Sequence, residues 1–173
     1  MAAVLLLLLY WFIFRFSAQD GEQSGSLSQL ISEKCVEAIN SLSGRHWSRA
    51  VMEELAEYFE HPIRKLAHFS EYACMGILVY ILLSQWIERG KRLWFFVTGW
   101  VFISAAGDEF HQLFVPGRYA SFADVCLDTC GGAFGMALCV LCLKIGIKVK
   151  NKRKSKNGKC CDKRNKTGRN PSV

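Results

Sequence analysis

The chain has 173 residues, of which 51% are hydrophobic and 21% charged, and its formal net charge is +7. Residues 144–173 carry a net charge of +11 and residues 1–143 a net charge of −4, so the basic character belongs to the C-terminal segment. We do not expect nucleic-acid binding, because the rest of the chain is acidic and has no helix-turn-helix, zinc-finger or RNA-binding motif.

Four apolar segments are candidates for membrane spans, which need about 20 mostly apolar residues. They cover residues 2–16, 66–87, 93–115 and 122–147. The first is short, but it lacks the basic start and the small-residue cleavage site of a signal peptide, so we expect an uncleaved anchor. The sequence therefore predicts an all-α membrane domain over residues 1–147, a bundle of four transmembrane helices.

The direction of the spans follows from the basic residues in short loops, which stay on the cytoplasmic side. Residues 88–92 contain three basic residues in five, and residues 148–173 form the strongly basic end of the chain. Both segments are expected in the cytoplasm, which places both termini there and residues 17–65 outside. The highly charged residues 148–173 are predicted to be a disordered tail.

The outer segment carries two sets of apolar residues at helical spacing, separated by Gly44 and followed by Pro62. Each set forms one stripe on an otherwise polar helix. We predict short amphipathic helices that lie on the membrane surface or cap the bundle. The two sets are Leu27, Leu30, Ile31, Cys35, Ala38, Ile39 and Leu42, then Trp47, Val51, Leu55, Tyr58 and Phe59.

Polar and ionisable residues gather where three of the predicted spans approach the outer surface. Such residues are costly in a membrane and mark either a functional site or a buried ion pair. With Arg118 in the turn between the last two spans, they predict an outward-facing polar site. The groups are Arg64, Lys65, His68 and Glu71, then Asp108, Glu109, His111 and Gln112, then Ser121, Asp124 and Asp128.

Two kinds of role are predicted within this site. A histidine beside a carboxylate can serve as a general base, and arginine grips phosphate or carboxylate. No motif supports a specific reaction, so whether the chain is an enzyme stays open. The candidate catalytic residues are His68, Glu71, Asp108 and His111, and the candidate substrate-binding residues are Arg64, Glu109, Gln112, Arg118, Ser121 and Asp124.

Other interpretations of the same residues stay open. His68, Glu71, Asp108 and His111 are an alternative set of ligands for zinc or manganese, although no cofactor is firmly implied. The site would otherwise bind an envelope ligand or a partner protein without catalysis, or relay protons in a transporter.

Packing alone would also explain some of these residues. Arg118 would then pair with Asp108, and Arg64 with Asp124, to hold the helices together. Gly131 and Gly135 form a small-x-x-x-small pair, for which residues 105–107 are the predicted partner.

Several motifs resemble those of VanZ-like membrane proteins, in the same order along the chain. They are RKLAHFSEY at residues 64–72, DEFHQ at 108–112, PGRYASFADV at 116–125 and DTCGG at 128–132. The resemblance covers about residues 1–147. It implies an envelope role in the cytoplasmic membrane of a Gram-positive-type bacterium. Because the predicted site faces the outer leaflet, where lipid head groups lie, our first hypothesis is that the chain acts on or recognises an envelope lipid or glycolipid. The family's prototype is named for teicoplanin resistance, so the resemblance also implies a link to glycopeptide resistance.

Overall fold

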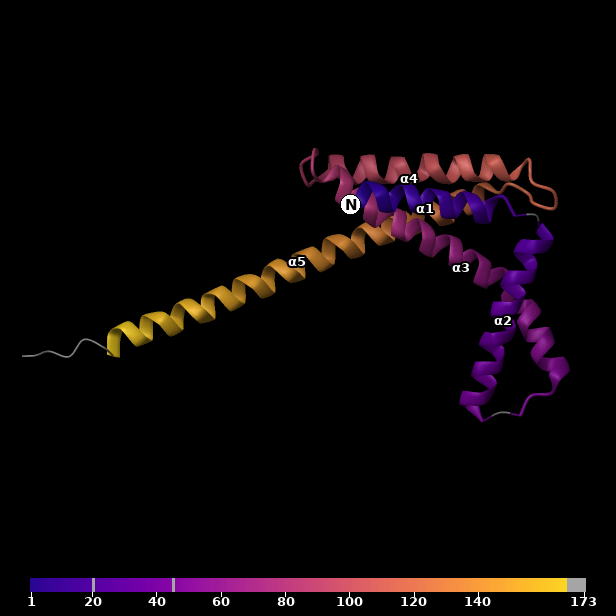
Figure 1. Cartoon of the computed structure of the whole chain (residues 1–173), viewed down its shortest axis with the longest axis horizontal. Coiled ribbons are helices and arrows are strands. Elements are labelled where there is room, and N and C mark those ends of the chain that lie inside the picture. The colour runs from indigo at the N-terminus through magenta and orange to yellow at the C-terminus, as the bar shows by residue number, and fades with distance from the viewer. Residues whose placement is uncertain (20, 45, 168–173) are drawn as a thin grey trace, which may run out of the picture. The chain divides into compact units, whose positions relative to one another are not determined.

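The computed structural model describes residues 1–19, 21–44 and 46–167, with side chains described except for residues 21–25 and 151–167. These residues form helices and no strand, which confirms the all-α prediction. The helices are α1 (Ala2–Ser17), α2 (Gly21–Ser43), α3 (Arg49–Leu83), α4 (Lys91–Gln112) and α5 (Phe122–Thr167), shown in Figure 1.

The chain divides into two compact units, and the first, Met1–Met136, contains α1 to α4 and the start of α5. The second begins at Ala137 and contains the remainder of α5. The boundary between these two compact units lies inside the predicted fourth span. Helix α5 also continues to Thr167, where the sequence predicts a disordered tail. Lysine and arginine are good helix formers, so the basic composition is compatible with a helix.

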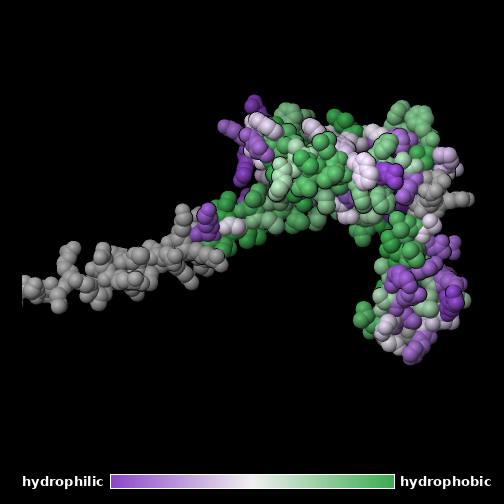
Figure 2. Space-filling view, in the orientation of Figure 1, coloured by the Kyte–Doolittle hydropathy of each residue, from purple (hydrophilic) through white to green (hydrophobic). Residues whose placement is uncertain are grey.

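Within the described part of the chain, two helices are long and apolar enough to cross a membrane, namely α3 and residues 122–150 of α5. Helix α1 is apolar but has only 16 residues. Helix α4 does not reach the same hydropathy, because charged residues at both of its ends shorten its apolar stretch. Large apolar side chains on α1 and α4 are nevertheless exposed, among them Leu7, Phe95 and Ile103, and Figure 2 shows hydrophobic residues over much of this surface.

Helix α3 joins two elements that the sequence predicts as separate. Most of the second amphipathic stripe and residues 66–83 of the span predicted at 66–87 belong to one 35-residue helix, which contains Pro62 and ends at Leu83. Proline removes one backbone hydrogen bond from a helix and often kinks or ends it. Packing of α2 along the first half of α3 supports the helix across this position.

Helix α2 and the first half of α3 form an antiparallel hairpin, which runs crosswise to α1 and α4 in Figure 1. Gly44 has φ +63°, a left-handed conformation suited to the reversal between the two helices. Val36 and Ala56 are buried, and Ser28 Oγ donates a hydrogen bond of 3.0 Å to Glu60 Oε1 across the hairpin. The predicted outer amphipathic segment is therefore helical along both of its stripes, except that Trp47 precedes the start of α3.

Glycines bring α3 and α5 into backbone contact. A Cβ added at Gly131 would meet the backbone of Phe69, and one added at Gly135 would meet the carbonyl oxygen of Ala73. The partner predicted for these two glycines, residues 105–107 of α4, is therefore wrong. A Cβ at Gly107 would meet nothing within 4 Å. Small residues allow close approach, but which helix approaches depends on the packing of the whole bundle.

Candidate functional site: a polar pocket between α3, α4 and α5

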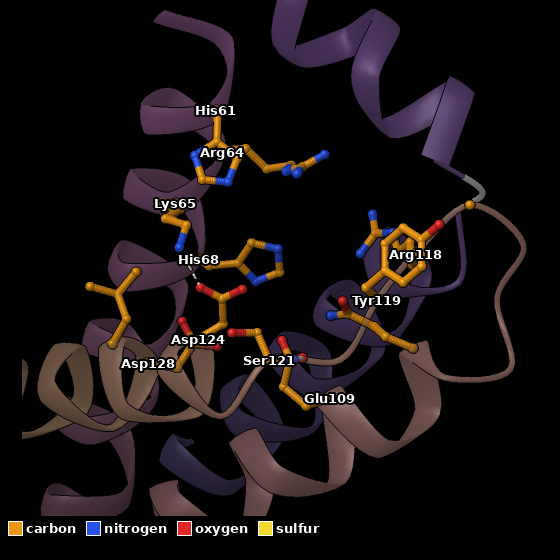
Figure 3. Close-up of a pocket in the computed structure, with 13 residues that line it drawn as sticks. His61, Arg64, Lys65, His68, Glu109, Arg118, Tyr119, Ser121, Asp124 and Asp128 are labelled. Atoms are coloured by element: carbon orange, nitrogen blue, oxygen red, sulfur yellow. Dashed lines mark hydrogen bonds and ion pairs between the residues drawn. The ribbon is translucent and has the colours of Figure 1, made fainter.

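A pocket of about 350 Å³ opens in the first unit, between the middle of α3, the end of α4 and the start of α5 (Figure 3). Ligand pockets occupy roughly 300–1,000 Å³, so this one can hold a small polar group. The lining residues are His61, Arg64, Lys65, His68, Glu109, Gln112, Gly117, Arg118, Tyr119, Ser121, Asp124, Leu127 and Asp128.

The structure places seven of the ten predicted site residues in this lining. All six predicted substrate-binding residues are among them, together with one predicted catalytic residue. They are Arg64, His68, Glu109, Gln112, Arg118, Ser121 and Asp124. The predicted convergence of three chain segments at one site is thus present in the fold.

Three of the predicted catalytic residues do not line the pocket. The His111 ring packs beside Phe14 of α1 with 4.9 Å between ring centroids, and Asp108 Oδ2 accepts a hydrogen bond of 3.1 Å from Gln112 Nε2. Glu71 lies farther along α3 than the four residues of that helix that face the pocket. Helical periodicity places residues on a face, but it does not say where along that face a pocket ends.

The alternative metal set is not assembled. Among the side chains that the structure describes, in residues 1–19, 26–44 and 46–150, no three of His, Cys, Asp or Glu are arranged to hold a metal ion. His68 lines the pocket, while His111 and Glu71 do not. The structure therefore gives no support to the zinc or manganese interpretation.

Four further polar residues line the pocket. Lys65 and Asp128 belong to the polar groups recognised in the sequence, which assigns them no role. His61 falls outside the prediction because Pro62 marks the expected start of the span, although His61 lies three residues before Arg64 on the same helical face. Tyr119 also lines the pocket, although it is 90% exposed. The only sequence feature that indicates this location is its position next to Arg118.

The loop between α4 and α5 is fastened to the ends of α4 and α1. The buried Glu109 side chain accepts a 2.8 Å hydrogen bond from the backbone N–H of Ser121. Gln112 Nε2 donates to Ser17 Oγ at 3.1 Å, and Arg118 Nη2 donates to the Phe16 carbonyl at 3.3 Å. Gly117 has φ +74°, which permits the turn just before Arg118. These bonds position Arg118 and Ser121 at the pocket.

One ion pair crosses the pocket wall, and it is not one of the two that the sequence suggests. Lys65 Nζ lies 2.7 Å from Asp124 Oδ1, so α3 and α5 are joined by the lysine and not by Arg64 (Figure 3). Arg118 likewise forms no ion pair with Asp108 and donates to a backbone carbonyl instead. Within the described part of the chain, Arg64 and Arg118 thus have no carboxylate partner within 4 Å.

The two arginines bring positive charge to one space. Figure 3 shows the Arg64 side chain extending from α3 toward the side of the pocket where Arg118 lies. Burial and the nearby positive charge of Arg64 lower the pKa of the Arg118 guanidinium. A bound anion would relieve this repulsion.

Two buried polar atoms of the lining have no hydrogen-bond partner in the described structure. They are Nε of Arg118, which is a donor, and Oδ1 of Asp128, which is an acceptor. Buried unpaired groups are uncommon, and each costs about 1–3 kcal/mol. Such groups in a pocket point to a ligand that pairs with them.

Comparison with known proteins places the pocket within a family domain. The family model described as VanZ/LLP1 matches residues 2–143, a range that contains every residue of the pocket lining. Comparisons with curated proteins and with solved structures give no match.

Proposed function

The chain belongs to the VanZ/LLP1 family, and we propose that it is a multi-pass membrane protein whose pocket recognises the phosphate-bearing head group of a cell-envelope lipid or glycolipid. The observation that carries this proposal is that Arg64 and Arg118 line one pocket and have no carboxylate within 4 Å among the described residues. Guanidinium groups bind phosphate through charge-assisted hydrogen bonds. The unpaired Nε of Arg118 supplies one donor for them.

Recognition accounts for the geometry better than catalysis does. Of the four candidate catalytic residues only His68 reaches the pocket, so the paired acid and base of the sequence hypothesis do not meet there. A proton path through the bundle would need polar groups along its depth. The buried core beyond the pocket consists instead of apolar side chains such as Met75, Val79 and Val101.

The proposed topology keeps both termini in the cytoplasm of a Gram-positive-type bacterium. The four spans are α1, the apolar half of α3, α4 and the apolar part of α5, and the basic loop 88–92 lies inside. The pocket then opens at the outer leaflet, at the level of lipid head groups. The hairpin of α2 and α3 lies on the outer surface, with exposed apolar residues such as Leu27 and Tyr58 toward the membrane.

Binding of a short-chain phospholipid tests the proposal. The probe is dihexanoyl phosphatidylglycerol, titrated calorimetrically into the purified full-length protein in detergent, with dihexanoylglycerol as the phosphate-free comparison. Arg118→Gln should weaken phospholipid binding at least tenfold, because hydrogen bonds to charged groups contribute about 1.5–3 kcal/mol.

The matched control is Arg15→Gln, which removes an exposed arginine on α1 whose guanidinium lies over the Trp11 ring, outside the pocket. It should leave binding unchanged. The proposal fails if Arg118→Gln binds the phospholipid as wild type does, or if the phosphate-free lipid binds equally well.

The link to teicoplanin resistance is part of the proposal and rests on family membership. A sensitive Gram-positive host expressing wild type should survive more teicoplanin than the same host expressing Arg118→Gln at a matched membrane level. Equal susceptibility of the wild-type strain and the empty host would remove resistance from the function of this member.

A further inference from the structure

Asp128 is the most deeply buried ionisable side chain of the pocket. It lies on the second turn of α5, where the residue is only 1% exposed, and its Oδ1 atom has no hydrogen-bond partner in the described structure. The glycine contact between α3 and α5 begins directly after it, since Gly131 packs against the backbone of Phe69. The buried carboxyl group thus lies beside the close contact between α3 and α5, at the inner end of the pocket lining.

Arg118 provides the complementary unpaired atom. Its buried Nε is a donor without an acceptor, whereas Asp128 Oδ1 is an acceptor without a donor. Figure 3 shows the two residues on opposite sides of the pocket, and no ion pair within 4 Å joins them. They cannot satisfy each other, so a ligand that satisfies both needs an acceptor at one end and a donor at the other.

The charged residues of the lining also favour a ligand that has both a hydrogen-bond acceptor and a hydrogen-bond donor. Lys65 and Asp124 form an ion pair with each other. The rest of the lining contains two basic residues, Arg64 and Arg118, and two acidic residues, Glu109 and Asp128. Glu109 already accepts a hydrogen bond from the Ser121 backbone. A purely anionic head group would pair with the arginines and leave the buried Oδ1 atom of Asp128 without a hydrogen-bond donor, which is unfavourable.

From these groups we infer that the pocket takes a zwitterionic lipid head group, in which a phosphate meets Arg64 and Arg118 and a primary ammonium meets Asp128. The inference rests on the proposed function, which covers the phosphate, and adds the ammonium as a second group that the pocket recognises. An ammonium has three N–H donors and a full positive charge, so it can donate to Oδ1 of Asp128 and form a charge-assisted pair with the carboxylate form of this side chain.

The test compares two short-chain lipids that share phosphate and acyl chains. Dihexanoyl phosphatidylethanolamine carries an ammonium, and dihexanoyl phosphatidylglycerol carries hydroxyl groups in its place. Each is titrated into the full-length protein in detergent, for wild type, Asp128→Asn and Asp128→Leu. Free phosphoethanolamine is titrated in parallel to separate a lipid ligand from a soluble one.

Wild type should bind the ethanolamine lipid at least tenfold more tightly than the glycerol lipid, and both variants should lose that preference. Their retained affinity for the glycerol lipid is the internal control for folding. Equal binding of the two lipids by wild type, or a preference that survives both substitutions, would overturn the inference and leave phosphate recognition intact.

Two further outcomes have distinct meanings. Binding of free phosphoethanolamine without binding of the lipid would assign the pocket to a soluble ligand and overturn the lipid assignment. Failure of both phospholipids to bind wild type would overturn the proposed function itself, and the inference with it.

Discussion

The contact between α3 and α5 is the feature whose disturbance should have the most specific effect. In Gly135→Ala the new Cβ would overlap with the carbonyl oxygen of Ala73. Extra volume in a packed core costs about 1–3 kcal/mol, and a backbone oxygen cannot rotate away, so we take the upper end, about 3 kcal/mol. Alanine gains about 1 kcal/mol over glycine within a helix, which leaves a net destabilisation of about 2 kcal/mol.

Gly99→Ala is the matched control for this substitution. Gly99 lies inside α4, where a Cβ meets nothing within 4 Å, so the same chemical change should be neutral or stabilise by up to about 1 kcal/mol. The measurement is the free energy of unfolding of the full-length protein in mixed micelles, followed by circular dichroism during titration with sodium dodecyl sulfate. Equal stability of the two variants would refute the packing argument.

The contact also sets the distance between the two helices that carry much of the pocket lining. Asp124 and Asp128 lie on α5, while Arg64 and His68 lie on α3. Gly135→Ala should therefore weaken binding of the phospholipid probe as well as lower stability. Reduced stability with unchanged affinity would mean that the pocket does not depend on this approach of α3 and α5.

Two other predictions concern side chains at or near the pocket. Because the Lys65 and Asp124 side chains are 38% and 32% exposed, a double-mutant cycle with Lys65→Gln and Asp124→Asn should give a coupling free energy of about 1 kcal/mol or less, which decreases with added salt. A coupling free energy of several kcal/mol that does not change with salt concentration would contradict this account. His111→Gln should change the affinity for phospholipid less than twofold, because His111 packs on Phe14 outside the lining. A tenfold loss of affinity in calorimetric titration would mean that His111 takes part in binding.

The family, the helical class and most of the polar residues that line the candidate pocket can be predicted from the amino-acid sequence alone. The motifs from residue 64 to residue 132 indicate the family, and the family match confirms it. Repetition at 3.6 residues places Arg64 and His68 on one face of a helix, and it does the same for Ser121 and Asp124. Such periodicity is local, so it can be read from a single chain.

Which of these residues meet depends on how the helices pack. Periodicity leaves the rotation and depth of each helix against its neighbours undetermined, and these decide that Asp124 pairs with Lys65 and that His111 faces α1. They also decide that α3 continues through Pro62, because α2 packs along it, and that Gly135 meets α3 and not α4. Ion pairing, burial and backbone approach depend on distances between segments far apart in the chain, which no local pattern encodes.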